Sequence, residues 1–219
     1  MTDGVILIDK PADMTSFGVV ARIRRVLSKE AGKKVKVGHT GTLDPFATGL
    51  MILTIGAECR NAGTYTKLDK VYEATIVLGA VSSTGDPEGE ITHLSDERPT
   101  GSQLDGVLNH FRGEITQTPP IFSAIKIAGK RAYKLAREGK EFEMPKRQVT
   151  VYSLELLSYE YPLLIVRAHV SSGTYIRSLA VDIGEALEIG AYCKELRRTR
   201  IAQWDVSDAQ QLADFGIEN

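Results

Sequence analysis

The sequence lacks most of the features that would place a protein in a membrane, in a disulfide-stabilised class or around a metal. Its 219 residues contain only two cysteines, Cys59 and Cys193, which are far apart and in no metal-ligand spacing. We therefore interpret both as small apolar side chains and expect no zinc site and no disulfide framework. No apolar run is long enough to span a bilayer, and residues 1–4 show no signal-peptide pattern. We expect a cytoplasmic protein.

The composition is that of a folded protein whose charge is unevenly distributed. Hydrophobic residues make up 42% and charged residues 25%, which argues against disorder. A net charge of −1 would argue weakly against a nucleic-acid partner if it were spread evenly. The basic residues instead gather in three clusters that favour a phosphate backbone as partner: Arg22, Arg24, Arg25, Lys29, Lys33, Lys34 and Lys36; Lys126, Lys130, Arg131, Lys134, Arg137 and Lys140; and Lys194, Arg197, Arg198 and Arg200.

One stretch, residues 38–56, combines a polar loop with a buried strand. Gly38 and Gly41 allow unusual backbone angles, and Pro45 biases Asp44 toward an extended conformation. The apolar run 50–53 indicates a strand buried on both faces. Asp44 is therefore either a local turn opener or a reactive group presented by a loop on a rigid strand, and the two interpretations are compatible.

Periodicity predicts alternating strands and helices along the rest of the chain. Strands are expected at 4–9, 70–79, 121–127, 148–157, 163–170 and 201–204. Helices are expected after Thr15 or Ser16, with Phe17, Val20, Ile23 and Leu27 on one face; at 102–111, capped by Ser102 and Asp105; at 131–138; from Ile176; and around Leu196 with the third basic cluster. Without a repeat or linker, residues 1–219 are interpreted as one α/β (α+β) domain with a mixed central sheet.

Several motifs together identify a family. The run Gly38-His39-Thr40-Gly41-Thr42-Leu43-Asp44-Pro45-Phe46-Ala47-Thr48-Gly49-Leu50 resembles the catalytic-loop motif of the bacterial tRNA pseudouridine synthase B (TruB) family. The same family pattern appears, in order, at 9–11, 71–72, 123–126, 131–133, 173–177 and 196–198. The resemblance covers nearly the whole chain and implies the pseudouridine-synthase fold, with a mixed, largely antiparallel sheet flanked by helices.

The resemblance also implies an activity: isomerisation of uridine 55 in the T loop of tRNA to pseudouridine, with the base flipped out and without a metal or other cofactor. Asp44 matches the catalytic aspartate and Arg177 the arginine that pairs with it. Residues matched to substrate binding are His39, Tyr72, Tyr175, Leu196, Asp86 and, in a supporting position, Lys10. A monomer that binds the T arm of tRNA, away from any membrane, is expected.

Two departures from the family pattern are visible. The usual C-terminal RNA-binding domain of the PUA type is not evident before Asn219, which bears on RNA affinity, and Ser83 stands where an acidic residue is more common.

Two other functions remain to be weighed. A tRNA-binding or tRNA-folding protein would use the same basic clusters without chemistry. A sugar-cleaving hydrolase fits less well, because that chemistry usually needs two carboxylates.

Overall fold

A computed structural model describes residues 3–217 and divides the chain into two compact units. Unit 1 joins the chain up to Tyr72 with the chain from Arg197 onward, and unit 2 is Glu73–Leu196. The principal sheet has the strand order β1-β3-β12-β4-β11-β10-β7, with β2 paired to β3 and β13 paired to β12. Strands β4 (Lys70–Leu78) and β12 (Ala191–Ile201) each run from one unit into the other.

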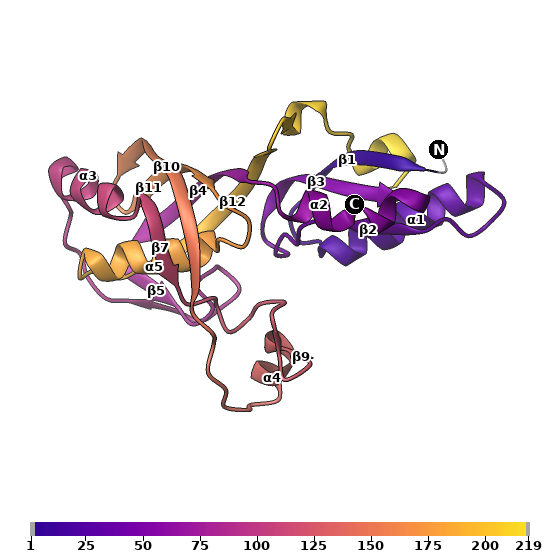
Figure 1. Ribbon diagram of the computed structural model, residues 1–219. Helices are drawn as coiled ribbons and strands as arrows, with labels where there is room; N and C mark the ends of the chain where they lie inside the picture. Colours follow the sequence, from indigo (N-terminus) through magenta and orange to yellow (C-terminus); the bar gives the residue numbers. More distant parts are fainter. Residues whose placement is uncertain (1–2, 218–219) are drawn as a thin grey trace. The chain divides into compact units, whose positions relative to one another are not determined.

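Unit 1 is built around the buried strand β3, Thr48–Ile55 (Figure 1). It pairs antiparallel with β1 (Gly4–Lys10) and β2 (Val37–His39) and parallel with β12. Every residue of β3 after Thr48 is buried, as the apolar run predicts. The remaining elements of unit 1 are α1 (Ser16–Glu30), η1 (Gly56–Arg60), α2 (Ala62–Thr66), β13 (Trp204–Asp205), η2 (Val206–Asp208) and η3 (Leu212–Phe215).

Helix α1 begins where the sequence predicts, but its inward face differs at the first turn. The Thr15 side chain accepts a hydrogen bond from the Gly18 N–H and caps the helix. Val20, Ile23 and Leu27 are buried as expected. Phe17 is 64% exposed, and Ser16 takes the inward position because its hydroxyl bonds the backbone of Leu43. A search for periodic apolar residues does not identify a polar residue that faces inward.

The prediction of a helix around Leu196 is wrong, because residues 191–201 form strand β12. The alternation of Leu196 and Arg198, both buried, with the more exposed Arg197 has a period of two. The prediction failed because Arg198 is charged but faces inward, so the strand does not show an alternation of apolar and polar residues. The predicted strand at 201–204 is the turn from β12 into β13.

In unit 2 the sheet continues through β4, β11 (Leu163–Val170), β10 (Arg147–Glu160) and β7 (Gly113–Gln117). Ala74, Ile76 and Leu78 of β4 are buried in alternation, as predicted. Helices α3 (Gly101–His110) and α5 (Ile176–Ala186) lie beside this sheet (Figure 1). A second, two-stranded sheet joins β5 (Ala80–Ser82) to β6 (Ile91–His93). Helix α3 is capped by Thr100 and Gln103, not by Ser102 and Asp105, since the helix starts one residue earlier than expected.

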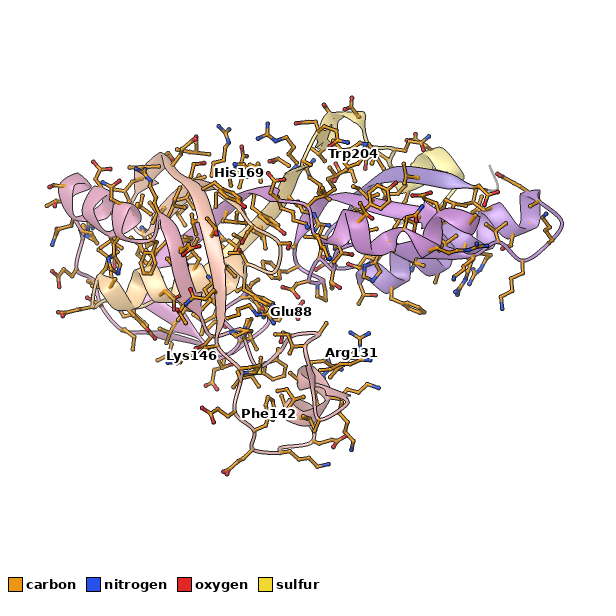
Figure 2. All side chains as sticks on the ribbon, viewed as in Figure 1. Glu88, Arg131, Phe142, Lys146, His169 and Trp204 are labelled. Atoms are coloured by element: carbon orange, nitrogen blue, oxygen red, sulfur yellow. The ribbon has the colours of Figure 1, made fainter. Side chains whose placement is uncertain are left out.

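Residues 118–146 form a small segment whose cations are exposed. It contains the hairpin of β8 (Lys126–Ile127) and β9 (Lys130–Arg131) followed by α4 (Ala132–Arg137). The predicted strand 121–127 is therefore reduced to its last two residues. Figure 1 shows α4 and β9 standing away from the sheet of unit 2, and Figure 2 shows Arg131 and Phe142 on this segment. All six cations of the second basic cluster are exposed.

These observations confirm the predicted fold class. The sheet is mixed and largely antiparallel, with β3 and β12 as a parallel pair, and helices flank it. Within residues 3–217, no helix is both long enough and apolar enough to cross a membrane.

Candidate active site

Asp44 lies in the irregular loop between β2 and β3, where it is half-buried. The Ala47 N–H donates to the Asp44 carbonyl oxygen at 3.2 Å, so Asp44-Pro45 does open a turn. The loop begins with Thr40, which is 3% exposed and donates through both its N–H and its hydroxyl to the Ile52 carbonyl. The loop that carries Asp44 is thus tied directly to the buried strand β3.

The residues on both sides of Asp44 are held by buried side chains. The Ser16 hydroxyl accepts from the Leu43 N–H at 2.8 Å and donates to the Leu43 carbonyl at 2.9 Å. The Lys10 ammonium donates to the Pro45 carbonyl at 3.0 Å and to the carbonyls of Pro11 and Met14 at 2.7 and 2.6 Å. Lys10 is fully buried, and these bonds indicate that it supports the loop; its predicted contact with substrate stays a prediction.

Arg198 of β12 braces the same loop from the neighbouring strand. Its side chain is 1% exposed and donates from Nε to the Leu50 carbonyl at 2.7 Å and from Nη2 to the Gly41 carbonyl at 3.2 Å. Burial and the nearby Arg198 charge lower the pKa of Lys70 to about 8. Two of the four cations in the third basic cluster are bound by the protein itself, because Arg198 is buried and Arg197 donates to the two Asp9 carboxylate oxygens at 3.1 and 2.7 Å. Lys194 and Arg200 are exposed.

The other matched residues of unit 1 are placed by its strands. His39 ends β2 and is half-buried, and Tyr72 of β4 is 9% exposed. The burial of Tyr72 confirms its predicted place on the apolar face of the strand. In unit 2, Leu196 of β12 is 8% exposed.

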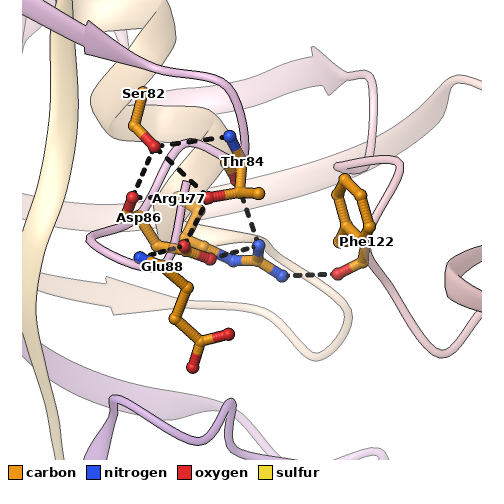
Figure 3. Close-up of polar contacts among 6 residues, drawn as sticks. All are labelled: Ser82, Thr84, Asp86, Glu88, Phe122 and Arg177. Carbon is orange, nitrogen blue, oxygen red and sulfur yellow. Dashed lines mark hydrogen bonds and ion pairs between the residues drawn. The ribbon is translucent and has the colours of Figure 1, made fainter. Parts of the chain in front are cut away.

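Arg177 and Asp86 form a buried ion pair in unit 2 (Figure 3). Arg177 Nη1 lies 2.7 Å from Asp86 Oδ2, and the two side chains are 3% and 4% exposed. Arg177 also donates to the carbonyls of Thr84 and Phe122 at 3.2 and 2.8 Å. The second Asp86 oxygen accepts from the Thr84 hydroxyl at 2.5 Å and the Glu88 N–H at 3.0 Å. Asp86 is thus a partner of Arg177 that the sequence motifs left undefined.

Tyr175 is fixed at the start of α5 by a residue that the sequence did not reveal. Gln117 is fully buried, and its side-chain amide accepts from the Tyr175 N–H at 3.0 Å and donates to the Tyr175 carbonyl at 3.2 Å. The guanidinium of Arg147 lies 5.5 Å from the centre of the Tyr175 ring, within range of a cation–π contact. A lone glutamine at the end of a strand carries no motif, so only the fold identifies it.

A cavity of about 380 Å³ lies beside Arg177 in unit 2. Its walls include the loop 82–85, the segment 118–122 and the α5 residues Ser178, Asp182 and Glu185. Burial, followed by the charge of Glu185, raises the pKa of Asp182 to about 6. Sequence reasoning did not single out Asp182, because it lies within a helix and outside every motif.

The structure therefore places the matched residues in two groups. Asp44, His39, Lys10 and Tyr72 belong to unit 1, whereas Asp86, Tyr175, Arg177 and Leu196 belong to unit 2. The expected pairing of Asp44 with Arg177 stays a prediction. Among residues 3–217, no group of three or more His, Cys, Asp or Glu side chains is placed to hold a metal ion.

Comparison with protein families matches residues 24–176 to the model described as TruB family pseudouridylate synthase (N terminal domain). Residues 177–217 match the tRNA pseudouridylate synthase B C-terminal domain. The first match alone covers more than half of the chain, so this protein belongs to the TruB family of pseudouridylate synthases.

Individual relatives agree with the family match. The chain is 48% identical to tRNA pseudouridine synthase B of Aquifex aeolicus, over 97% of this chain and 73% of the relative. It is 44% identical to the protein of the same name from Azoarcus sp., over 97% of this chain and 69% of the relative. The relative of that name from Endomicrobium trichonymphae is 41% identical and is covered to 90% of its length.

Solved structures show the same fold at lower identity. A chain in the crystal structure of a Cbf5-Nop10-Gar1 complex is 32% identical, with a TM-score of 0.75 over 97% of this chain. A chain in the structure of an H/ACA RNP bound to a substrate RNA containing 2'-deoxyuridine is 29% identical, with a TM-score of 0.70. The present chain spans about half of each, 53% and 56%.

Proposed function

We propose that this protein is a tRNA pseudouridine synthase that isomerises uridine 55 in the T loop. The observation that carries the proposal is the Asp44 loop, held at Thr40, Gly41, Leu43 and Pro45, in a chain of the TruB family. In the reaction the bond from uracil N1 to the ribose C1′ breaks, the base rotates, and a bond from C5 to C1′ forms. The hydrogen on C5 leaves as a proton and N1 gains one, so the reaction is an isomerisation.

Asp44 is the proposed catalytic residue, as a nucleophile or base toward the sugar or the base. An ionised carboxylate can attack carbon or accept a proton, and an adjacent arginine keeps it ionised by lowering its pKa. We propose Arg177 as that arginine. Because Arg177 already bonds Asp86 and two carbonyls, its guanidinium is fixed in place before substrate arrives.

The remaining matched residues are proposed to receive the flipped nucleotide. A uridine inside folded RNA must leave its stack before it can react, and aromatic side chains hold unstacked bases. We assign stacking to Tyr72, with Tyr175 and Leu196 lining the pocket and His39 holding the RNA loop open. Asp86 orients Arg177, and Lys10 orients the Asp44 loop. Both units belong to the proposed catalytic domain, residues 1–219, which acts as a monomer in the cytoplasm without a cofactor.

The first and second basic clusters are proposed to hold the tRNA backbone. All the cations of the second cluster are exposed, as are most of those of the first, on and after α1. Contacts of this kind neutralise phosphates and release counterions, so they confer affinity without sequence specificity.

The decisive experiment is release of tritium from a tRNA transcript labelled at uridine C5, with Asp44→Asn as the comparison. We expect release by the unaltered chain, none by Asp44→Asn, and equal RNA binding by both. Binding without release by the unaltered chain would instead identify a tRNA-binding protein without catalysis. Mapping the product to a position other than 55 would correct the proposed site.

A further inference from the structure

The loop that carries Asp44 is held by two buried side chains, Ser16 and Arg198, to which no part of the proposed reaction assigns a role. Ser16 is 2% exposed and uses its hydroxyl both as donor and as acceptor on Leu43, the residue before Asp44. The Leu43 carbonyl belongs to the peptide group that ends at the Asp44 nitrogen. Because Ser16 holds that carbonyl and the preceding N–H, it restricts the rotation that would swing the Asp44 side chain.

Arg198 restrains a longer stretch of the same loop. Its guanidinium is a planar fork, and it joins the carbonyls of Gly41 and Leu50, which lie before and after Asp44. Its own backbone pairs with Gly49, where a side chain would meet the Arg198 carbonyl oxygen at 2.3 Å. The guanidinium and the backbone of one residue therefore both fix the loop to β12.

We infer that Ser16 and Arg198 are positioning residues for Asp44. This inference rests on the proposed function. A displacement of a reacting group by about 1 Å can lower a rate about a hundredfold, so a hydroxyl that orients the peptide before Asp44 influences the rate without touching substrate. Both residues act through the backbone, and neither changes the charge of the carboxylate.

The test removes one hydroxyl at a time from α1. Ser16→Ala deletes the two bonds to Leu43, whereas the matched control Ser28→Ala deletes a single bond that the Ser28 hydroxyl accepts from the Val35 N–H at 3.0 Å. Rates of tritium release are measured in single turnovers with saturating protein, beside the dissociation constant for the RNA. Ser16→Ala should slow release at least about tenfold and leave the dissociation constant within about twofold. Ser28→Ala should change neither.

A second pair of variants tests the arginine. Arg198→Lys retains the charge but cannot span both carbonyls. Its control is Arg112→Lys in unit 2, because Arg112 also donates two N–H groups, both to the Leu154 carbonyl. We expect slower single turnovers for Arg198→Lys alone, at an unchanged dissociation constant.

Hydrogen exchange of the backbone amides at 41–47 gives a readout that needs no activity. Ser16→Ala should speed exchange at Leu43 and its neighbours, and Ser28→Ala should not. An unaltered turnover rate in Ser16→Ala, or an equal loss in Ser28→Ala, would overturn the inference even if the unaltered chain is an active synthase. If the unaltered chain releases no tritium, the proposed function fails, and unchanged exchange in Ser16→Ala would then overturn the positioning of the loop as well.

Discussion

At the scale of single residues, the pair of Arg177 and Asp86 contrasts with an ion pair at the surface of the same unit. Both Arg177 and Asp86 are almost fully buried, so neither charge has water to stabilise it. Arg167 and Glu73 lie at the same kind of distance, 2.8 Å, but are 44% and 38% exposed. Loss of the buried pair should therefore cost more stability than loss of the exposed pair, although the two N–O distances are similar.

We predict that Asp86→Asn lowers the free energy of unfolding by about 3 kcal/mol, because it leaves a buried guanidinium without its counter-charge. Glu73→Gln, the matched control, should cost at most about 1 kcal/mol. Urea unfolding of both variants measures the difference. Similar losses in the two variants would show that burial of the pair is unimportant.

Asp182 makes the folding stability of the protein depend on pH. Its folded pKa of about 6 lies above the ordinary value of 3.8, because burial and Glu185 disfavour the carboxylate. The folded state therefore binds more protons than the unfolded state between these two values, and stability falls as pH rises through that window. Asp182→Asn should remove this fall and, after allowance for solvent screening, raise stability at pH 7.5 by about 1–2 kcal/mol. Unfolding free energies at pH 4 and pH 7.5 test this, and an unchanged pH dependence would contradict it.

The loop position of Asp44 and the buried position of Tyr72 could be predicted from the sequence, whereas the backbone groups bound by buried polar residues could not. Asp44 stood out because glycines and a proline surround it, and Tyr72 because its strand alternates cleanly. Ser16, Gln117 and Arg198 are polar residues inside the protein, where apolar patterns predict nothing. Their importance comes from the backbone groups they satisfy, which only the folded chain brings within reach.

At the scale of elements, the parallel contact of β3 with β12 depends on one glycine. Gly49 has φ of 105° and lies so close to β12 that an added Cβ would meet the Arg198 oxygen and nitrogen at 2.3 and 2.7 Å. Backbone conformation and space both exclude a side chain there.

We predict that Gly49→Ala destabilises the protein by at least about 2 kcal/mol and slows tritium release, because the strand bearing the loop must shift. Gly63→Ala in helix α2 is the control, since a Cβ there would meet nothing within 4 Å. It should be neutral or stabilise by up to about 1 kcal/mol. Thermal unfolding and the turnover assay measure both; a stable, active Gly49→Ala protein would show that the strands part easily.

Elements with a clean period were predictable, and elements that mix polar residues into the buried face were not. Strands β1, β3, β4 and β11 and helices α1 and α5 follow apolar patterns. The prediction for β12 was wrong because Arg198 faces inward. The predicted start of α3 was wrong because two capping patterns overlap within 100–105. The observed cap, Thr100 with Gln103, has the glutamine that a capping box requires three residues after the cap, whereas Ser102 is followed there by Asp105.

At the scale of the whole molecule, the net charge of −1 conceals an uneven distribution of the basic residues. The exposed cations of 126–140 lie on one small segment. In the third basic cluster, by contrast, Arg197 bonds Asp9 and Arg198 bonds the Leu50 carbonyl. Only the folded chain distinguishes a cation that faces solvent from one that bonds carbonyls.

We predict that the double variant Lys130→Ala and Arg131→Ala weakens RNA binding and flattens its salt dependence by about two units in the slope of log K against log salt. Turnover at saturating RNA should change little. Lys67→Ala, an exposed cation outside the three clusters, is the control and should leave the slope unchanged. Binding titrations at several salt concentrations measure these slopes. Equal slopes for the unaltered chain and both variants would show that this segment does not contact the RNA backbone.

The bracing of the Asp44 loop by Arg198 also has a consequence for how the protein is made. The two bonds from Arg198 join residues that are 148 and 157 positions apart in the chain. A ribosome delivers the loop early and its brace late, after the whole of unit 2 has emerged. Nascent chains that stop short of β12 would carry the proposed catalytic aspartate on a loop without this support, so we expect competence for reaction only once β12 has been synthesised.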